Sequence, residues 1–200
     1  MRLLLATHNA HKAREFERLM APATDAACVA LDVLDDAVEL PPEDGETFAD
    51  NAFGKARFAA AASGRTTIAD DSGIAAAALG GAPGVRSARY AGEGASDAEN
   101  LARLLREAPE GSALEYICVI AYVDPSSGEE HSFEGRCTGT LTARARGERG
   151  FGYDPAFVPD EGPPGLTMAE LSDDEKDAIS HRGRAARALL GWLAGDARAG

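Results

Sequence analysis

A long hydrophobic run is missing from the start of this sequence. Met1 to Ala6 contains only a four-residue apolar run, too short for the core of a signal peptide and far too short to cross a membrane. We therefore expect a cytoplasmic protein with no membrane segment. Its 200 residues suffice for one domain, or one domain with two lobes, that buries well over half of its unfolded surface.

Cysteine is also scarce. Cys28, Cys118 and Cys137 are odd in number and widely spaced, and no Cys-x-x-Cys pair occurs. This pattern argues against a disulfide framework and against a zinc site. The three residues are predicted to be buried thiols.

The sequence has fewer basic than acidic residues. The chain has 20 Lys and Arg residues against 33 Asp and Glu residues, which gives a net charge of −13. A surface of that sign repels the phosphates of nucleic acids, so we expect no nucleic-acid partner. An anionic ligand would need a local basic pocket or a metal ion.

Lysine is the rarest of the charged residues. Among the 20 basic residues only Lys12, Lys55 and Lys176 are lysines. Either the three lysines occur at these positions by chance, or each stands where a compact ammonium group serves a role that a planar guanidinium group could not. These positions are therefore candidates for a functional role.

Hydrophobic periodicity predicts the order of the secondary structure. Strands are expected at residues 2–6, 28–34, 66–70, 113–123 and 130–144, the last two forming a hairpin around the turn 125–128. Helices are expected at 12–20, 47–63, from the N-cap Ser96 to about Glu107, after the N-cap Ser172, and at 182–194. Residues 150–159 should form a loop or a short strand. This order indicates an α/β protein with a mixed sheet.

The segment Thr7-His8-Asn9-Ala10-His11-Lys12 joins the first strand to the first helix and contains no glycine. Its hydroxyl, amide and ammonium donors lie just before a helix N-terminus, where backbone N–H groups and the helix dipole favour an anion. Thr and Asn are also ordinary helix-capping residues. The segment is therefore either a phosphate-binding loop or a cap.

Two adjacent carboxylates, Asp70 and Asp71, follow the apolar end of the third strand, and a turn is expected at Asp71-Ser72-Gly73. Carboxylates at this place in an α/β sheet are often metal ligands or general bases. Successive strand side chains point to opposite faces, so at most one of the two should reach a metal unless the turn has begun. Glu43 could be a second oxygen ligand for Mg²⁺. The alternative is a simple Asx-type turn.

The helix at 47–63 places Asn51 and Lys55 on one face, although a lone lysine on a helix is usually solvated. The aromatic-rich segment Phe151-Gly152-Tyr153-Asp154-Pro155 could stack a base while Asp154 accepts a hydrogen bond from the base edge. Aromatic residues are more often part of a core.

Donor groups also gather before the last helix, at Lys176 and at Ser180-His181-Arg182-Gly183. They could contact a ligand. The alternative is that Ser180 caps the helix and that His181 is a surface imidazole.

Together these segments resemble the inosine triphosphate pyrophosphatase family, also called the XTP/dITP diphosphatases. The likeness runs nearly end to end and includes all three lysines. It is carried by residues 5–12, 46–52 with 55–57, 68–73 with 80–84 and 87–90, 150–155 and 180–183. Many relatives have glycines where this chain has His8 and His11, which leaves the backbone path of the first loop open.

The resemblance implies an elongated mixed β-sheet flanked by helices, in one two-lobed domain of residues 1–200 with a central active-site cleft, and usually a homodimer. It also implies Mg²⁺-dependent hydrolysis of ITP, dITP and XTP to the monophosphate and pyrophosphate, which cleanses the nucleotide pool. The base pocket would favour a 6-oxo purine such as hypoxanthine or xanthine.

By position, the resemblance makes Asp71 the catalytic carboxylate and a magnesium ligand. Glu43 is the other ligand, with Asp44 and Glu39 as alternatives. The triphosphate contacts would be Thr7, His8, Asn9, Ala10, His11, Lys12, Lys55 and Ser72. The base pocket would consist of Phe151, Gly152, Tyr153, Asp154, Lys176, His181 and Arg182.

Two other functions are compatible with parts of the sequence. A Maf-type nucleotide pyrophosphatase would have an arginine pair in place of His11-Lys12 and would lack the His181-Arg182 pair. A non-catalytic nucleotide sensor would gain nothing from uncompensated acids such as Asp70 and Asp71 beside a polyphosphate. Both are less favoured than the triphosphate pyrophosphatase.

Overall fold

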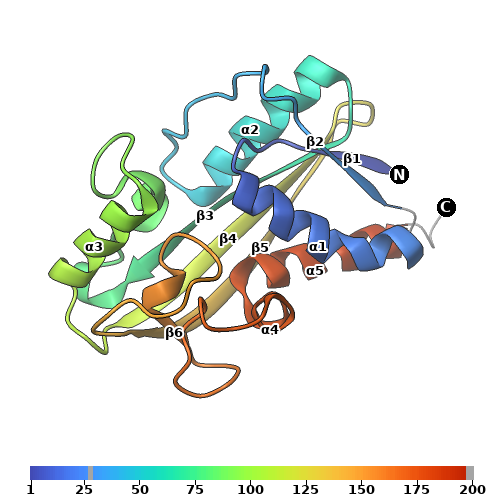
Figure 1. The fold of residues 1–200 in the computed structure, drawn as a ribbon. Helices are drawn as coiled ribbons and strands as arrows, with labels where there is room; N and C mark the ends of the chain where they lie inside the picture. The colour runs from blue at the N-terminus through green and yellow to red at the C-terminus, as the bar shows by residue number, and fades with distance from the viewer. Residues whose placement is uncertain (27–28, 197–200) are drawn as a thin grey trace. The chain divides into compact units, whose positions relative to one another are not determined.

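The computed structural model describes residues 1–26 and 29–196. In this part of the chain, a mixed six-stranded sheet has the hydrogen-bonded order β2-β1-β3-β4-β5-β6 (Figure 1). β1 pairs in parallel with β2 and β3, and β5 pairs antiparallel with β6. The predicted α/β class with a mixed sheet is confirmed. The strands are β1 Arg2–Leu5, β2 Ala30–Val33, β3 Thr67–Ala76, β4 Ala113–Asp124, β5 Glu129–Leu141 and β6 Phe157–Pro159.

Local capping sets the start of three helices. Thr47, Ser96 and Ser172 are N-caps, and each forms a capping box with an acidic residue three positions later, which satisfies otherwise unpaired N–H groups. The caps predicted at Ser96 and Ser172 are thus confirmed. The helices are α1 Ala10–Ala26, α2 Phe48–Ser63, α3 Asp97–Glu107, α4 Asp173–Ile179 and α5 His181–Asp196.

The predicted turn at Asp71-Ser72-Gly73 is wrong. β3 continues through these residues to Ala76, because Ile74 and Ala76 are buried in a hydrophobic core beyond them. The Ile74 N–H also donates to the Ser87 hydroxyl at 2.9 Å. Core packing thus keeps the chain extended where its local sequence favours a turn.

The chain divides into two compact units. Unit 1 consists of Met1–Asp71, Cys118–Gly135 and Arg184–Gly200, and unit 2 of Ser72–Ile117 and Arg136–Gly183. The division falls within β3, β4, β5 and α5. In β3 it separates the neighbouring residues Asp71 and Ser72.

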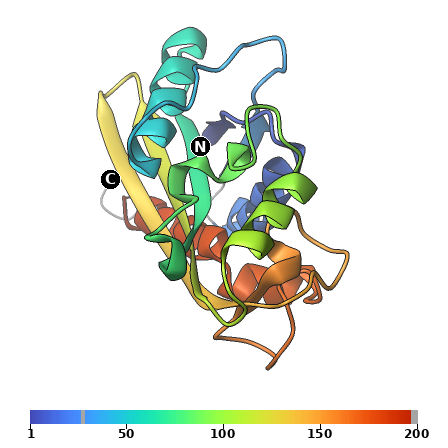
Figure 2. The same cartoon turned by 90° about the vertical axis from the view of Figure 1, so that its left-hand side faces the viewer.

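The sheet of unit 1 is covered on both faces. Alternate residues of β1 point to opposite sides, so Leu3 and Leu5 belong to one core cluster and Leu4 and Ala6 to another. The first cluster includes residues of α1 and α5, and the second includes four alanines of α2. Figures 1 and 2 show α2 on one face and α1 beside α5 on the other.

Unit 2 has a core of its own. It joins residues of β3, α3 and β4 to the aromatic residues Tyr116, Tyr153 and Phe157. Tyr153 is anchored there because its hydroxyl donates to the Ser87 carbonyl at 2.7 Å. This core therefore fixes the segment that follows Phe151.

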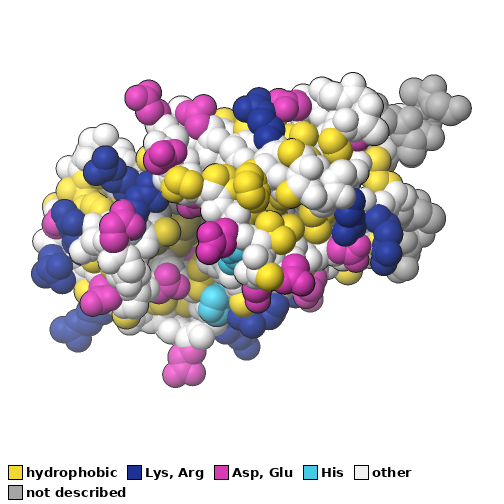
Figure 3. All heavy atoms as spheres, turned by 90° about the horizontal axis from the view of Figure 1, so that it is seen from above, with side chains coloured by type: hydrophobic (Ala, Val, Ile, Leu, Met, Phe, Trp, Pro, Cys, Tyr) yellow, Lys and Arg dark blue, Asp and Glu magenta, His cyan; other side chains and the backbone are white. Residues whose placement is uncertain are grey.

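Cys118 and Cys137 are buried thiols, as predicted, whereas Cys28 lies outside the described residues. Among the helices of the described residues, none is long and apolar enough to cross a membrane. On the face drawn in Figure 3, acidic and basic side chains are interspersed.

Candidate active site

The N-terminus of α1 is capped by the residues that precede it. The Asn9 side-chain oxygen accepts from the N–H groups of His11 and Lys12 at 2.9 and 3.1 Å, and the Thr7 hydroxyl accepts from the Asn9 N–H at 3.2 Å. Capping by these residues is thus present. No acceptor in the described part of the chain takes up the N–H groups of the exposed residues His8 and Ala10. These two groups are suited to an anion.

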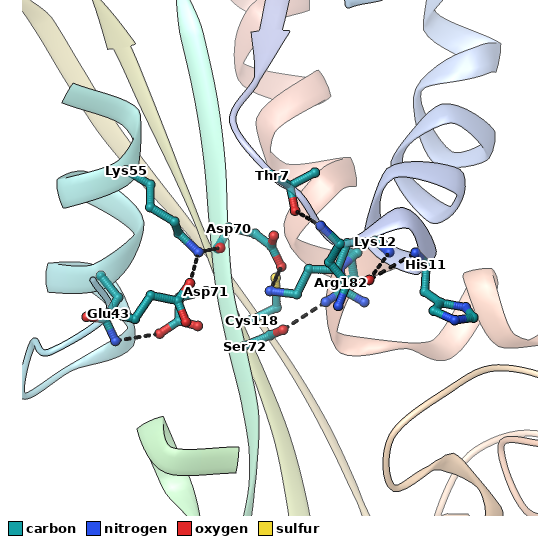
Figure 4. Close-up of polar contacts among 12 residues, drawn as sticks. Thr7, His11, Lys12, Glu43, Lys55, Asp70, Asp71, Ser72, Cys118 and Arg182 are labelled. Atoms are coloured by element: carbon teal, nitrogen blue, oxygen red, sulfur yellow. Dashed lines mark hydrogen bonds and ion pairs between the residues drawn. The ribbon is translucent and has the colours of Figure 1, made fainter. Parts of the chain in front are cut away.

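Asp70 and Asp71 point to opposite faces of β3, as the strand alternation predicts once the strand continues. The Asp70 carboxylate is fully buried and lies 3.1 Å from Lys12 Nζ and 3.9 Å from Cys118 Sγ. Asp71 accepts a hydrogen bond of 2.8 Å from the side-chain amide of Asn51. Figure 4 shows the two carboxylates directed away from one another.

Lys55 connects these groups from α2. Its buried ammonium donates to the Asp70 carbonyl at 2.6 Å and forms an ion pair with Glu43 (Figure 4). The alternative of a solvated lysine is therefore wrong for Lys55. We call the group formed by Lys12, Glu43, Asn51, Lys55, Asp70 and Asp71 the carboxylate–lysine cluster; all of it lies in unit 1.

Burial and neighbouring charges shift the pKa values in this cluster. Burial raises the pKa of Asp71, and the charge of Glu43 raises it further, while Lys12, Lys55 and the Asn51 hydrogen bond act in the other direction. Burial acts to lower the pKa of Lys55, but Asp70, Glu43 and Asp71 outweigh it, so the pKa of Lys55 is raised. Lys55 remains a cation at neutral pH, and Asp71 is a stronger base than an ordinary carboxylate.

The donor set fits a hard divalent cation. Glu43 acts electrostatically on Asp71, whereas the alternatives Asp44 and Glu39 are exposed. Among the described residues, no group of three or more His, Cys, Asp or Glu side chains could enclose a metal. Mg²⁺ is usually held by one or two carboxylates together with phosphates and water. The Glu43 and Asp71 carboxylates agree with that manner of binding.

In unit 2, the Asp154 carboxylate is surrounded by donors. Oδ2 accepts from Lys176 Nζ at 2.6 Å and from the Phe151 N–H at 2.9 Å, and Oδ1 accepts from the Tyr116 hydroxyl at 3.1 Å. Asp154 is also 97% buried, with 3% of its surface exposed. Both oxygens are thus engaged by the protein. Asp154 is better placed to hold Lys176 than to accept from a base edge.

The two aromatic residues of the Phe151–Asp154 segment have different surroundings. Phe151 is half-buried, and its ring centroid lies 5.2 Å from Lys176 Nζ and 5.6 Å from Arg182 Cζ. Tyr153 instead belongs to the core of unit 2, where burial raises the pKa of its phenol. Phe151 is therefore the residue suited to stack a base.

His181 and Arg182 begin α5, and both are buried. The alternative of a surface imidazole is wrong, because the His181 ring is stacked on Tyr116 at a centroid distance of 4.5 Å and an interplanar angle of 4°. The Ser180 hydroxyl caps the helix by accepting from the Gly183 N–H at 3.0 Å. Arg182 donates to the Ser72 hydroxyl at 2.8 Å (Figure 4).

Two residues that contact these groups were not among the predicted site residues. Tyr116 reaches both Asp154 and His181, and Asn51 donates to Asp71. The only sequence signal for Asn51 is weak: it shares a helix face with Lys55. Tyr116 follows Glu115 in β4 and shares a buried strand face with Leu114 and Cys118, and that alternating pattern indicates only burial.

Comparisons with known proteins agree on one family. The family model described as the Ham1 family matches residues 3–192. A relative from Corynebacterium glutamicum (strain R), named dITP/XTP pyrophosphatase, is 46% identical and is aligned over 97% of both chains. One from Cutibacterium acnes with the same name is 44% identical over 94% of both chains.

Solved structures give the same result. A HAM1 protein from Coxiella burnetii matches with a TM-score of 0.84 and 35% identity, covering 98% of this chain and 99% of that one. A structure titled nucleoside-triphosphatase / dITP/XTP pyrophosphatase, from Mycobacterium abscessus, matches with a TM-score of 0.72 and 42% identity, covering 95% of this chain and 99% of that one.

Proposed function

The chain belongs to the Ham1 family, and from this premise we propose that it hydrolyses non-standard purine nucleoside triphosphates such as dITP, ITP and XTP to the monophosphate and pyrophosphate. Relatives named for this activity support the proposal. Neither a Maf-type enzyme nor a non-catalytic sensor is favoured by the names of these relatives.

The observation that carries the proposal is the carboxylate–lysine cluster. Hydrolysis of a triphosphate requires cations that balance the phosphate charge and a base that activates water. Lys12 and Lys55 supply cations, and Asp71 is a buried carboxylate with a raised pKa. The α1 N-terminus adds the N–H groups of His8 and Ala10.

In this mechanism Asp71 accepts the proton of the attacking water. A carboxylate in this position can act as a general base for the water. Asn51 fixes the orientation of the carboxylate through its hydrogen bond. The attack is directed at the α-phosphorus, with pyrophosphate as the leaving group.

Glu43 and Asp71 are the residues that would hold Mg²⁺, which when bound would neutralise charge on the phosphates. Lys55 keeps Glu43 in place through their ion pair. Lys12, on α1, is held by Asp70 and contributes a compact positive charge.

Residues of unit 2 would bind the purine. Phe151 stacks against the base, while Lys176, His181 and Arg182 supply donors for a 6-oxo group. Adenine presents an amino group at that position, so it would leave buried donors unpaired. Asp154 holds the Lys176 ammonium through their 2.6 Å hydrogen bond.

We also propose that the protein is a homodimer, as the resemblance implies, and that it acts in the cytoplasm. Light scattering coupled to size-exclusion chromatography tests the dimer against the chain mass of 20.8 kDa.

Product analysis tests the proposed reaction. ITP incubated with the protein and Mg²⁺ should give IMP and pyrophosphate, separated by ion-exchange chromatography, and EDTA should stop the reaction until excess Mg²⁺ is added. The variant Asp71→Asn serves as the control for contaminating phosphatases. Formation of IDP and orthophosphate would show cleavage at the γ-phosphorus and would contradict the mechanism.

A further inference from the structure

Tyr116 contacts two rings in unit 2. Its ring lies 4.6 Å from that of Phe157, at an interplanar angle of 41°, and 4.5 Å from the His181 imidazole, to which it is nearly parallel. Phe157 is fully buried and Tyr116 is 6% exposed. The tyrosine ring therefore has little freedom, and it sets the plane in which the His181 ring lies.

The hydroxyl of Tyr116 has a separate contact. It donates to Asp154 Oδ1, while Lys176 and the Phe151 N–H both donate to Oδ2. The carboxylate is tightly enclosed: a Cβ atom at Gly150 would lie 2.1 Å from Oδ2. Fixing Oδ1 thus also fixes the direction in which Oδ2 faces Lys176.

We propose that Tyr116 is a positioning residue for purine discrimination, acting through His181 on one side and through Asp154 and Lys176 on the other. This inference rests on the proposed function, because it concerns the donors that would face the 6-oxo group. Tyr116 itself need not touch the substrate. Its ring aligns one donor, and its hydroxyl aligns the carboxylate that holds a second.

A purely structural role for Tyr116 gives a different expectation. A tyrosine that only fills the core would be replaced well by phenylalanine, apart from some loss of stability, and base preference would not change. The hydroxyl, however, is partnered by a buried carboxylate that also binds Lys176. Its removal should change the placement of Lys176 and therefore the discrimination between bases.

Two substitutions separate the two contacts. Tyr116→Phe keeps the stack and removes the hydrogen bond, whereas Tyr116→Leu removes both. Tyr122→Phe and Tyr122→Leu are matched controls, because Tyr122 is a buried tyrosine of the same strand that packs against Trp192 in unit 1. Steady-state kinetics with ITP and with ATP should be measured for all four variants, together with Tm.

The expected result is a change in specificity rather than a uniform loss. Tyr116→Phe should raise KM for ITP about tenfold, the size of one hydrogen bond to a charged group, with little change in kcat. The ratio of kcat/KM for ITP over ATP should fall by a similar factor. Tyr116→Leu should reduce the ratio further. The Tyr122 variants should lower Tm while keeping the ratio of the unmodified protein.

The stack has a readout that does not depend on turnover. The chain has four histidines, so their imidazole signals can be resolved by NMR and His181 assigned with His181→Gln. The His181 signal should keep its ring-current shift in Tyr116→Phe and lose it in Tyr116→Leu. Added IMP should shift this signal in the unmodified protein much more than in Tyr116→Leu.

The outcomes distinguish this proposal from the proposed function. If the unmodified protein releases no pyrophosphate from ITP, the proposed function fails, and the response of His181 to IMP still decides the role of Tyr116. If pyrophosphate is released but both Tyr116 variants keep the ITP-to-ATP ratio, the positioning role is overturned. An IMP response of His181 that is unchanged in Tyr116→Leu would overturn it as well.

Discussion

At the scale of single residues, the adjacent aspartates of β3 have different surroundings. Asp70 is fully buried and bound to Lys12, while its carbonyl accepts from Lys55. Asp71 accepts from Asn51 and is influenced by Glu43. We infer that Asp70 holds the two lysines in place and that Asp71 performs the chemistry.

The exchange of each aspartate for asparagine tests this division. Asp71→Asn should lower kcat for ITP by roughly a hundredfold or more, as expected when a general base is lost. Asp70→Asn should instead act mainly on KM and lower Tm, since Lys12 loses a buried counter-charge. Pyrophosphate release and thermal unfolding measure the two effects. Near-normal turnover of Asp71→Asn with a folded but inactive Asp70→Asn would reverse the roles.

The raised pKa of Asp71 also predicts a pH-dependent gain of stability in Asp71→Asn. A carboxyl group whose pKa is higher in the folded than in the unfolded state destabilises the fold when it ionises, and this cost disappears at low pH. The asparagine variant should therefore have a higher Tm than the unmodified protein at neutral pH, measured in EDTA. The difference should shrink as pH falls through the raised pKa of Asp71. A constant difference at every pH would contradict this origin.

At the scale of elements, the start of α2 determines where Asn51 lies. The Asn51 side-chain oxygen accepts from the Gly45 N–H at 2.8 Å, while its amide nitrogen donates to Asp71. A Cβ atom at Gly45 would lie 2.6 Å from Asp50 Cβ and 2.7 Å from Asn51 Oδ1. The glycine is thus required for the close approach of the preceding loop to α2.

Two glycine-to-alanine substitutions give opposite predictions. Gly45→Ala should displace Asn51, and both Tm and kcat/KM for ITP should fall. Gly54→Ala is the control: Gly54 is exposed within α2 and a Cβ there meets nothing within 4 Å. It should raise the free energy of unfolding by about 0.5–1 kcal/mol, the difference in helix propensity. Equal effects of the two changes on activity would show that Gly45 does not control Asn51.

Helix starts that are marked by residues close together in the sequence were predicted well. The extent of β3, which depends on packing in the core, was not. Ser96 and Ser172 mark helix starts through side chains that are three residues apart in sequence, so the signal is local. β3 passes Asp71 because Ile74 and Ala76 are buried by distant residues, which no local pattern shows. The helix predicted at 12–20 covers residues 10–26, and the cap at Asn9 accounts for its earlier start.

At the scale of the whole molecule, candidate residues were easier to find than their partners. Lys12, Lys55 and Lys176 were singled out because lysine is rare, and each pairs with a carboxylate of the candidate site. The contacts of Tyr116 with Asp154 and His181 span 38 and 65 positions along the chain. Such contacts depend on the sheet, and a single sequence does not reveal them.

The carboxylate–lysine cluster belongs to unit 1, and the residues assigned to the purine belong to unit 2. If the proposed function holds, substitutions should therefore fall into two kinetic classes. Changes in unit 1 act on groups that every triphosphate shares, so Asp71→Asn should lower kcat/KM for ITP, GTP and ATP by similar factors. Changes in the residues of unit 2 that are assigned to the purine act on recognition of the base.

Arg182→Ala is the test of the second class. The unmodified protein should prefer ITP and XTP over GTP, and GTP over ATP, because adenine brings an amino group toward buried donors at a cost of about 1–3 kcal/mol for each one left unpaired. Arg182 is 1% exposed and donates to Ser72. Removal of the Arg182 side chain should lower the ratio of kcat/KM for ITP over kcat/KM for ATP. The value for ITP should fall, while the value for ATP changes little. Competition assays with both nucleotides measure this ratio directly. A uniform loss for ITP and ATP in Arg182→Ala would place Arg182 with the groups that act on the phosphates, and the separation of tasks between the two sets of residues would not hold.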